Sequence, residues 1–299
     1  MPMLLRCTRP DTPLDPPGEL VVPHDPTGSF EAAFAFRVYD DLRPEQRWSA
    51  WPDLEPLMKG PRPHPSWLVT SAGAIDTELG VLKTGKEADV HLIERRDPLD
   101  GTGGAVMAAK RYRTAAHSSF HRSAAYTEGR SMKRSRDERA LKRKSSWGQV
   151  VAAGEWAASE WEALNRCWRL GLPVPYPVQI DGTEIMMEWI THGEQTAPRL
   201  VQTRPEPDLL DAYFEQIRSV LCRLAEAGVV HGDLSPYNVL AAGERLVVID
   251  LPQMVDLAGN QQAGAFLLRD CTNLCAWFRA RGLDVDEHDL FAEVMAHGY

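Results

Sequence analysis

The chain lacks the features that would tie it to a membrane or to an oxidising compartment. No run of about 18 apolar residues occurs, so no membrane span is expected. The apolar stretch at residues 1–6 is too short for a signal peptide. The 5 cysteines form no CxxC pair and no His/Cys spacing typical of a metal site. We therefore expect a reducing, cytoplasmic setting.

Positive charge is also scarce. The 33 Lys and Arg residues against 42 Asp and Glu residues give a formal net charge of −9. This balance argues against nucleic-acid binding by the molecule as a whole. Apolar residues make up 43% and charged residues 25%, as in ordinary globular proteins. The length of 299 residues fits about two domains or one two-lobed domain.

Proline is concentrated near the start of the chain. Residues 1–65 hold 13 of the 22 prolines, which predicts a largely irregular N-terminal extension in which only 30–42 could be helical. Residues 66–299 are then expected to form a single domain. Its N-lobe would span about 66–187 and its C-lobe about 191–299.

Hydrophobic periodicity indicates strands early in this domain and helices late. The segment 111–150 is crowded with Lys and Arg and is predicted to be a mobile basic loop that could contain some helix. Strands first and helices later favour an α+β fold with a sheet-rich N-lobe and a helical C-lobe. The expected strands are 81–93 (two strands around a turn at Thr84-Gly85), 105–110, 184–190 and 245–250, and the expected helices are 154–170, 208–227, 262–281 and 286–296.

One segment carries most of the functional information, the sequence VVHGDLSPYNVL at 229–240. Asp233 precedes Asn238 by five residues, and Asp250 follows the apolar stretch LVVI. This D-x-x-x-x-N pattern with a later Asp is typical of kinase-like phosphoryl transfer. Asp233 can orient an acceptor hydroxyl, while Asn238 and Asp250 can offer oxygens to Mg²⁺. His231 is interpreted as a structural residue of the loop.

Two earlier residues could complete such a site. Lys110 ends the apolar stretch VMAA and could hold nucleotide phosphates if a carboxylate supported its side chain. Glu160, in the amphipathic helix, could be that carboxylate. Each residue alone is typical of an exposed surface position, so the assignment depends on their order relative to Asp233 and Asp250.

A possible P-loop is rejected. The segment 80–86, GVLKTGK, fits the start of G-x-x-x-x-G-K-[ST], but Glu87 follows where Ser or Thr is needed for Mg²⁺. The surrounding pattern is also strand-turn-strand rather than strand-loop-helix. We interpret it as a turn that covers phosphates, with Gly85 allowing close backbone approach.

Taken together, these motifs resemble the RIO family of atypical serine/threonine kinases. The resemblance covers about 75–280 and leaves out the N-terminal extension. The matching pieces are KTGKEADV at 83–90, AKRY at 109–112, the helix around Glu160, MEWI at 187–190, HGDLSPYN at 231–238, IDLPQ at 249–253 and FLLRDCTN at 266–273.

The resemblance implies a two-lobed protein-kinase-like fold of RIO type with a reduced helical C-lobe. It also implies ATP and Mg²⁺ as cofactors, with Mn²⁺ as an alternative metal. The activity would be phosphoryl transfer to protein Ser/Thr, including autophosphorylation, or ATPase turnover. In this family the metal-binding Asp can accept phosphate, so Asp250 is a candidate acceptor as well as a ligand.

The family's site maps onto this sequence position by position. Asp233 would be the catalytic base and Lys110 would hold the ATP phosphates, paired with Glu160. Asn238 and Asp250 would bind the metal. The remaining nucleotide-binding positions would be Thr84, Gly85 and Lys86 at the triphosphate, Val90 in the nucleotide site, Met187 beside the nucleotide, and Glu188 and Ile190 at the adenine hinge.

Two alternative functions stay open. HGDLSPYN also suits small-molecule phosphotransferases of the aminoglycoside or choline kinase kind, although only 49 residues follow Asp250 here. The basic run from Arg130 to Lys144 would suit a nucleotide-sensing scaffold for ribosomal or RNA partners. The run lacks interleaved aromatic residues for base stacking, and a solvated loop is the simpler interpretation.

Overall fold

The computed structural model describes residues 42–99, 103–113 and 146–298. The chain divides into two units, residues 1–42 and 43–299, and every described element lies in the second unit. The predictions for 1–41, and those for the basic run from Arg130 to Lys144, therefore lie outside the described residues.

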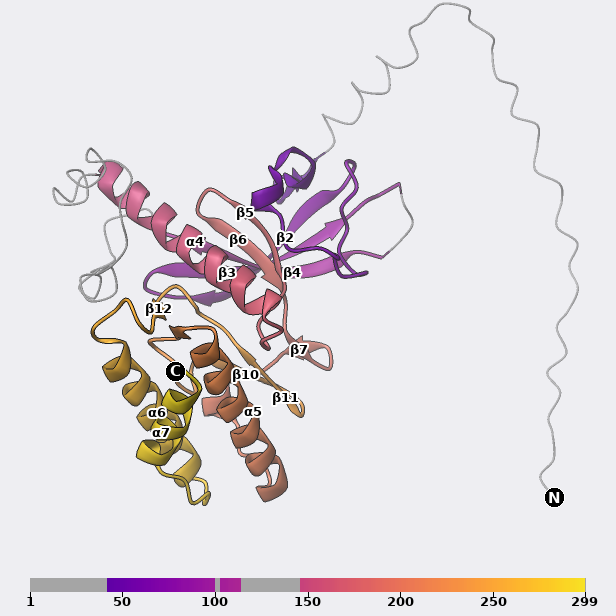
Figure 1. Cartoon of the computed structure of the whole chain (residues 1–299). Coiled ribbons are helices and arrows are strands. Elements are labelled where there is room, and N and C mark those ends of the chain that lie inside the picture. The colour runs from indigo at the N-terminus through magenta and orange to yellow at the C-terminus, as the bar shows by residue number, and fades with distance from the viewer. Residues whose placement is uncertain (1–41, 100–102, 114–145, 299) are drawn as a thin grey trace, which may run out of the picture. The chain divides into compact units, whose positions relative to one another are not determined.

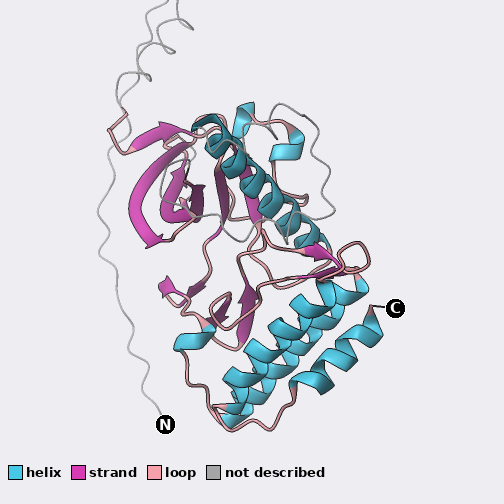
Figure 2. Cartoon of the chain, turned by 90° about the vertical axis from the view of Figure 1, so that its left-hand side faces the viewer, coloured by secondary structure: helices cyan, strands magenta, loops and turns pink. Residues whose placement is uncertain are grey.

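The N-lobe is built on an antiparallel sheet of six strands (Figures 1 and 2). Residues of β4 alternate between its two faces: Met107 and Ala109 join an apolar cluster, whereas Lys110 and Tyr112 point to the opposite side. The sheet order is β1-β2-β3-β4-β6-β5, with β1 Gln46–Trp48, β2 Ile75–Thr84, β3 Ala88–Arg96, β4 Ala105–Tyr112, β5 Pro177–Asp181 and β6 Glu184–Glu188.

The compact unit begins earlier than the boundary predicted at residue 65. β1 pairs with β2, and the short 3-10 helices η1 (Trp51–Asp53) and η2 (Pro56–Met58) follow it. Trp51 is buried in the apolar cluster of the sheet, and Gly60 N–H donates to the Val178 carbonyl at 2.8 Å. Proline is compatible with the first positions of short helical turns. The proline content of 43–65 therefore does not prevent this segment from packing.

A long helix, α4 (Ser146–Arg169), packs on β4, β5 and β6. Its buried residues Ala157, Trp161 and Leu164 follow the predicted helical spacing. The helix begins at 146 rather than 154, so the predicted loop at 111–150 is too long at both ends, because β4 also continues to Tyr112. The run from 146 to 153 contains no proline and permits this extension.

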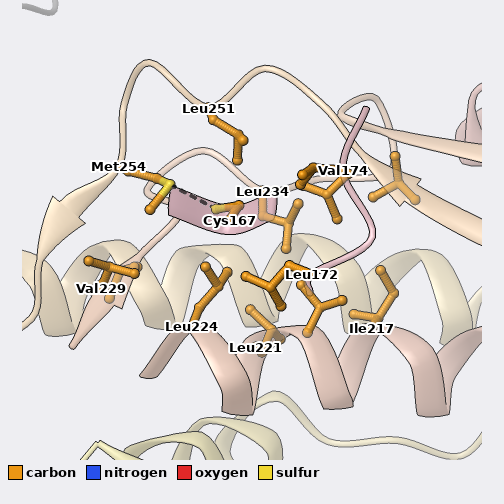
Figure 3. Close-up of a cluster of buried hydrophobic side chains, with 14 of the residues drawn as sticks. Cys167, Leu172, Val174, Ile217, Leu221, Leu224, Val229, Leu234, Leu251 and Met254 are labelled. Atoms are coloured by element: carbon orange, nitrogen blue, oxygen red, sulfur yellow. Dashed lines mark hydrogen bonds between the residues drawn. The ribbon is translucent and has the colours of Figure 1, made fainter. Parts of the chain in front are cut away.

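The C-lobe is predominantly helical, as predicted. Its main helices are α5 (Pro207–Glu226), α6 (Ala263–Arg279) and α7 (Glu287–His297). Figure 3 shows the core between them and the neighbouring loops, where Leu221 and Leu224 of α5 pack near Leu234 and Met254. The small two-stranded sheets are β7 (Thr191–His192) with β8 (Gln195–Thr196), β9 (Val229–Val230) with β12 (Val255–Asp256), and β10 (Val239–Ala242) with β11 (Arg245–Val248).

None of the helices in the described ranges combines the length and the apolar character that a bilayer crossing requires.

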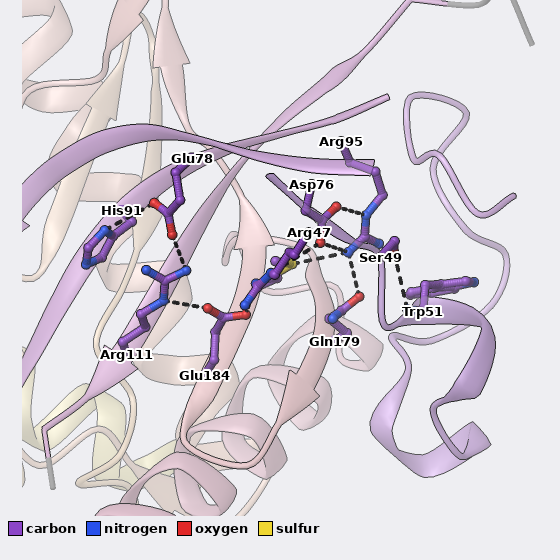
Figure 4. Close-up of polar contacts among 11 residues, drawn as sticks. Arg47, Ser49, Trp51, Asp76, Glu78, His91, Arg95, Arg111, Gln179 and Glu184 are labelled. Atoms are coloured by element: carbon purple, nitrogen blue, oxygen red, sulfur yellow. Dashed lines mark hydrogen bonds and ion pairs between the residues drawn. The ribbon is translucent and has the colours of Figure 1, made fainter. Parts of the chain in front are cut away.

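The N-lobe sheet contains a fully buried arginine. Arg95 Nε donates to Asp76 Oδ1 at 2.6 Å and Nη2 donates to Asp76 Oδ2 at 2.9 Å (Figure 4). Nη2 also donates to Gln179 Oε1 at 2.9 Å, so the pair connects β2, β3 and β5. Buried charges are tolerated in proteins only when they are paired and hydrogen-bonded. Asp76 is therefore needed to keep Arg95 inside the sheet.

We predict that Asp76→Ala lowers the free energy of unfolding by about 3–5 kcal/mol, because it leaves the buried Arg95 guanidinium uncompensated. Asp181→Ala, at an exposed position of β5, is the matched control and should change it little. Urea unfolding of both variants measures the difference. Equal, small changes in the two variants would show that the pair is dispensable.

Candidate active site

Lys110 lies at the centre of the predicted site. It is paired across the sheet with Val90 of β3 and Ile185 of β6. Its side chain projects from the face of the sheet that α4 partly covers. Lys110 Nζ donates to Glu160 Oε1 at 2.7 Å and to Asp250 Oδ1 at 2.8 Å. The Tyr112 hydroxyl donates to the second Glu160 oxygen. One ammonium group therefore joins a strand, a helix and the loop after β11.

Charge compensation keeps this lysine ionised. Burial lowers the pKa of Lys110, but the carboxylates of Asp250 and Glu160 outweigh burial and hold that pKa well above its usual value. Glu160 is almost completely buried and Lys110 is 14% exposed. A charged ammonium held in this way can contact nucleotide phosphates.

Asp250 occupies an uncommon backbone conformation. With φ of +67° it is the one non-glycine residue of the described ranges in the left-handed region. Burial raises the pKa of Asp250, but the charge and hydrogen bond of Lys110, together with His231 and Lys83, outweigh burial and bring that pKa below its usual value. The carboxylate is 46% exposed, so it is both charged and accessible to ligands. Strained backbone of this kind is often found at functional sites.

The catalytic loop, residues 231–238, follows directly from α5. Gly228, with φ of +71°, ends the helix, and β9 leads into His231. The side-chain amide of Asn238 donates to the Asp233 carbonyl at 2.9 Å, which leaves its oxygen for a cation. Asp233 is 36% exposed and lies 3.8 Å from Arg269.

His231 has a structural position. It is fully buried, its Nδ1 accepts from the Asp233 N–H at 3.3 Å, and its Nε2 lies 3.4 Å from the Ile249 carbonyl. These contacts assign the proton to Nε2. Burial lowers the pKa of His231 to about 4, so the ring is neutral at pH 7. The ring thus connects the catalytic loop to the strand end before Asp250.

The predicted nucleotide-binding residues surround the same face of the sheet. Val90 is paired with Lys110. Met187 is paired with Ala108, which lies two residues before Lys110 on β4. The Glu188 N–H donates to the Tyr176 carbonyl and the Ile190 carbonyl accepts from Ala197, so these groups are already used. The Glu188 carbonyl and the Ile190 N–H are the hinge groups that could meet an adenine.

Thr84 is the last residue of β2, and Gly85 and Lys86 lie in the turn that leads to β3. Gly85 N–H donates to the Ala88 carbonyl at 3.0 Å, and a Cβ at Gly85 would lie 2.7 Å from that oxygen. The turn therefore requires glycine at this position. Thr84 and Lys86 are exposed beside it.

Two further cations of this site were not predicted from the sequence. Lys83 is the β2 partner of Val90, so it shares the row and the face of Lys110. Arg199 is bridged to Leu240, beside the hairpin that runs from Asn238 to Asp250. Burial and the nearby Arg199 lower the pKa of Lys83, while Asp250 opposes them. A register shift between Val81 and Lys83 interrupts the period-two pattern of β2, so the sequence carried no signal for Lys83, and it carried none for Arg199.

Asp270 of α6 is a third residue that the sequence analysis missed. It is fully buried, and its two oxygens accept from the N–H groups of Gly232 and Leu234, each at 2.9 Å. Burial raises the pKa of Asp270 to about 7, against the opposing effect of these two donors. Arg269 donates to the Gly232 carbonyl. The Arg-Asp pair therefore fixes the backbone on both sides of Asp233. Asp270 lies in the Arg-Asp-Cys motif at 269–271, and that motif could have pointed to it.

The fold and the site define a two-lobed protein of the protein-kinase-like class. Three features meet between the lobes: a lysine paired with a helix glutamate, a D-x-x-x-x-N loop, and an aspartate of the kind that binds metal. The family model described as RIO domain matches residues 98–290, more than half of the chain. The chain belongs to the RIO family. This confirms the predicted family and the predicted enzyme class, a RIO-type kinase.

Curated relatives agree with this assignment. The chain is 37% identical to the RIO-type serine/threonine-protein kinase Rio1 of Haloferax volcanii, over 73% of this chain and 69% of that protein. It is 31% identical to the protein of the same name from Methanocaldococcus jannaschii, over 71% of this chain and 67% of that one.

A solved structure supports the fold. The Rio2 kinase–ADP/Mg²⁺–phosphoaspartate complex from Chaetomium thermophilum matches with a TM-score of 0.50 and 21% identity. The match covers 73% of this chain and 62% of that chain, so this chain spans less than two thirds of it. The predicted α+β, kinase-like fold is confirmed.

We predict that Asp270→Asn lowers the free energy of unfolding by about 1–3 kcal/mol, because an amide offers one acceptor oxygen where two buried N–H groups need one each. Displacement of the catalytic loop should also reduce turnover on the order of 100-fold. Asp284→Asn, at an exposed position, serves as control. Thermal unfolding and ATP turnover measure the two effects. Unchanged turnover in Asp270→Asn would contradict the anchoring role.

We also predict that His231 makes stability depend on pH. Its folded pKa lies below 6.5, so its contribution is present above pH 6.5 and is lost as pH falls towards about 4. The loss is on the order of 3 kcal/mol. The stability difference between the wild type and His231→Gln should therefore shrink over this range. His288→Ala, which removes an exposed histidine, should show no such trend.

Proposed function

We propose that this RIO-type kinase transfers the γ-phosphoryl group of ATP with Mg²⁺ bound by Asn238 and Asp250. The observation that carries the proposal is the position of Lys110 Nζ, 2.7 Å from Glu160 and 2.8 Å from Asp250. It brings the predicted phosphate-binding lysine to the predicted metal-binding carboxylate. Mg²⁺ held there would neutralise charge on the transferring phosphoryl group. Mn²⁺ is a chemically similar alternative.

The donor set of the site fits a hard cation. Asp250 offers an accessible carboxylate, and Asn238 is oriented by its amide contact to Asp233 so that its oxygen remains available. Both are oxygen ligands, which Mg²⁺ prefers. Lys110 would hold the phosphates once its contact with Asp250 is exchanged for a contact with nucleotide.

Asp250 is also a candidate phosphate acceptor. In that reaction a carboxylate oxygen of Asp250 forms a bond to the γ-phosphorus while the bond to the β-phosphate oxygen breaks, and ADP leaves. A carboxylate nucleophile carries no proton, so this step needs no base. Hydrolysis by water would complete an ATPase cycle, with Asp233 taking the proton of the attacking water. The phosphoaspartate in the Chaetomium thermophilum Rio2 complex is a precedent within the family.

Transfer to a protein serine or threonine is the second output of the same site. Asp233 lies at the exposed edge of the catalytic loop, 3.8 Å from Arg269, where it could orient an incoming hydroxyl. The relatives named serine/threonine-protein kinases favour this output. The protein substrate and a ribosomal or RNA partner stay predictions. The alternative of a small-molecule acceptor and the cytoplasmic setting also stay predictions.

We predict that Asp233→Ala lowers ATP turnover and Ser/Thr transfer by about 10²- to 10⁴-fold, because the group that orients and deprotonates the nucleophile is lost. Asp211→Asn, at an exposed position on α5, is the control and should behave like the wild type. The assay uses the full chain, γ-labelled ATP and Mg²⁺. Equal turnover in Asp233→Ala and wild type would reject the proposal, and rapid saturable phosphorylation of an amino or hydroxyl compound would favour a small-molecule acceptor.

The chemistry of the label separates the two outputs. A label on Asp250 should be released by hydroxylamine, should be absent in Asp250→Asn, and should still form in Asp233→Ala. A label on serine or threonine should resist hydroxylamine and be lost in Asp233→Ala. A hydroxylamine-sensitive label that persists in Asp250→Asn would exclude Asp250 as the acceptor.

A further inference from the structure

Helices α5 and α7 face each other with two pairs of potential metal ligands. Cys222 and Glu226 are four residues apart on α5, and Glu293 and His297 are four residues apart on α7. Residues at this spacing lie on one face of a helix. The two helices are in contact, so the two faces meet. No sequence pattern points to this group, because its members come from two helices about 70 residues apart.

The ligand atoms are close together. Cys222 Sγ, a carboxylate oxygen of Glu293 and a ring nitrogen of His297 all lie within 4.8 Å of one another. Tetrahedral Zn²⁺, with bonds of about 2.0–2.3 Å, would hold such atoms about 3–4 Å apart. The difference is within reach of side-chain rotation.

Neighbouring side chains orient these ligands. His297 Nδ1 lies 2.8 Å from Glu226 Oε1, which leaves Nε2 as the nitrogen for a metal. Glu293 Oε1 accepts from Arg218 Nη1 at 2.6 Å, which leaves its other oxygen. Metal-binding histidines almost always donate their second N–H to a carboxylate or carbonyl, and ligating carboxylates are themselves hydrogen-bonded. Both features of an outer shell are therefore present.

The chemistry of the donor set selects the metal. A thiol and an imidazole favour Zn²⁺, whereas Mg²⁺ prefers oxygen ligands.

We propose that Cys222, Glu293 and His297 bind Zn²⁺, with Glu226 orienting the imidazole and water at the fourth position. Binding forms a bond between zinc and the thiolate and releases the thiol proton to solvent. The ion ties α7 to α5, the helix that leads through Gly228 into the catalytic loop. The site thus stabilises the C-lobe, separately from the Mg²⁺ chemistry between the lobes.

The proposal is tested with the full chain after treatment with a chelator. Titration with Co²⁺ should produce a thiolate-to-cobalt charge-transfer band that saturates at one equivalent and is removed by Zn²⁺. Zn²⁺ should also raise the unfolding temperature. Cys222→Ser should abolish the band, and Glu226→Gln should weaken zinc affinity about 10- to 100-fold, as is usual for the partner of a metal-bound histidine.

Matched variants guard against binding elsewhere and against misfolding. Cys275→Ser removes another buried cysteine and should keep the band, and His288→Ala removes an exposed histidine of α7 and should keep the thermal shift. His297 is partly exposed, so His297→Ala should fold and lose that shift even if Cys222→Ser does not fold. A Zn²⁺-induced shift that is equal in wild type and His297→Ala, or no charge-transfer band in the wild type, would overturn the proposal.

Discussion

The contact of Lys110 with Glu160 and Asp250 is the interaction on which the rest of the site depends. Lys110 is separated by 50 residues from Glu160 and by 140 from Asp250, so the contact forms only when the sheet, α4 and the C-lobe are all in place. Glu160 is nearly inaccessible to water. A buried carboxylate is tolerated because the ammonium compensates it. The positive charge of Lys110 that permits the burial of Glu160 is also the charge that nucleotide phosphates require.

The catalytic loop is held by its backbone, which leaves its functional side chains available. Asp270 accepts from the N–H groups on either side of Asp233, and His231 accepts from the Asp233 N–H itself. The Asp233 side chain is 36% exposed and lies 3.8 Å from Arg269. Gly232, with φ of +83°, gives the turn its left-handed step. Rigid support of this kind reduces the cost of positioning a reactive group.

Local sequence patterns predicted the parts of the molecule that depend on local chemistry. The strand ending near Lys110, the amphipathic helix of Glu160 and the loop from Asp233 to Asn238 each carry their own periodicity or spacing. Lys110 was assigned from its order relative to the loop, because a single lysine has no signature. Arg199 could not be found in this way, since only the bridge to Leu240 brings it near Asp250. The packing of Trp51 was obscured by surrounding prolines.

The charges around Asp250 explain how a chain with a net charge of −9 can suit a polyanionic ligand. Lys83 of β2 and Lys110 of β4 lie on one face of the sheet, on either side of Val90 of β3, and Arg199 approaches from the C-lobe. Burial, Arg199 and Lys110 lower the pKa of Lys83, whereas Asp250 opposes them. Glu160 and Asp250 offset two of the three cations, which leaves one positive charge among these five groups. A triphosphate entering between the lobes would relieve the repulsion among the cations.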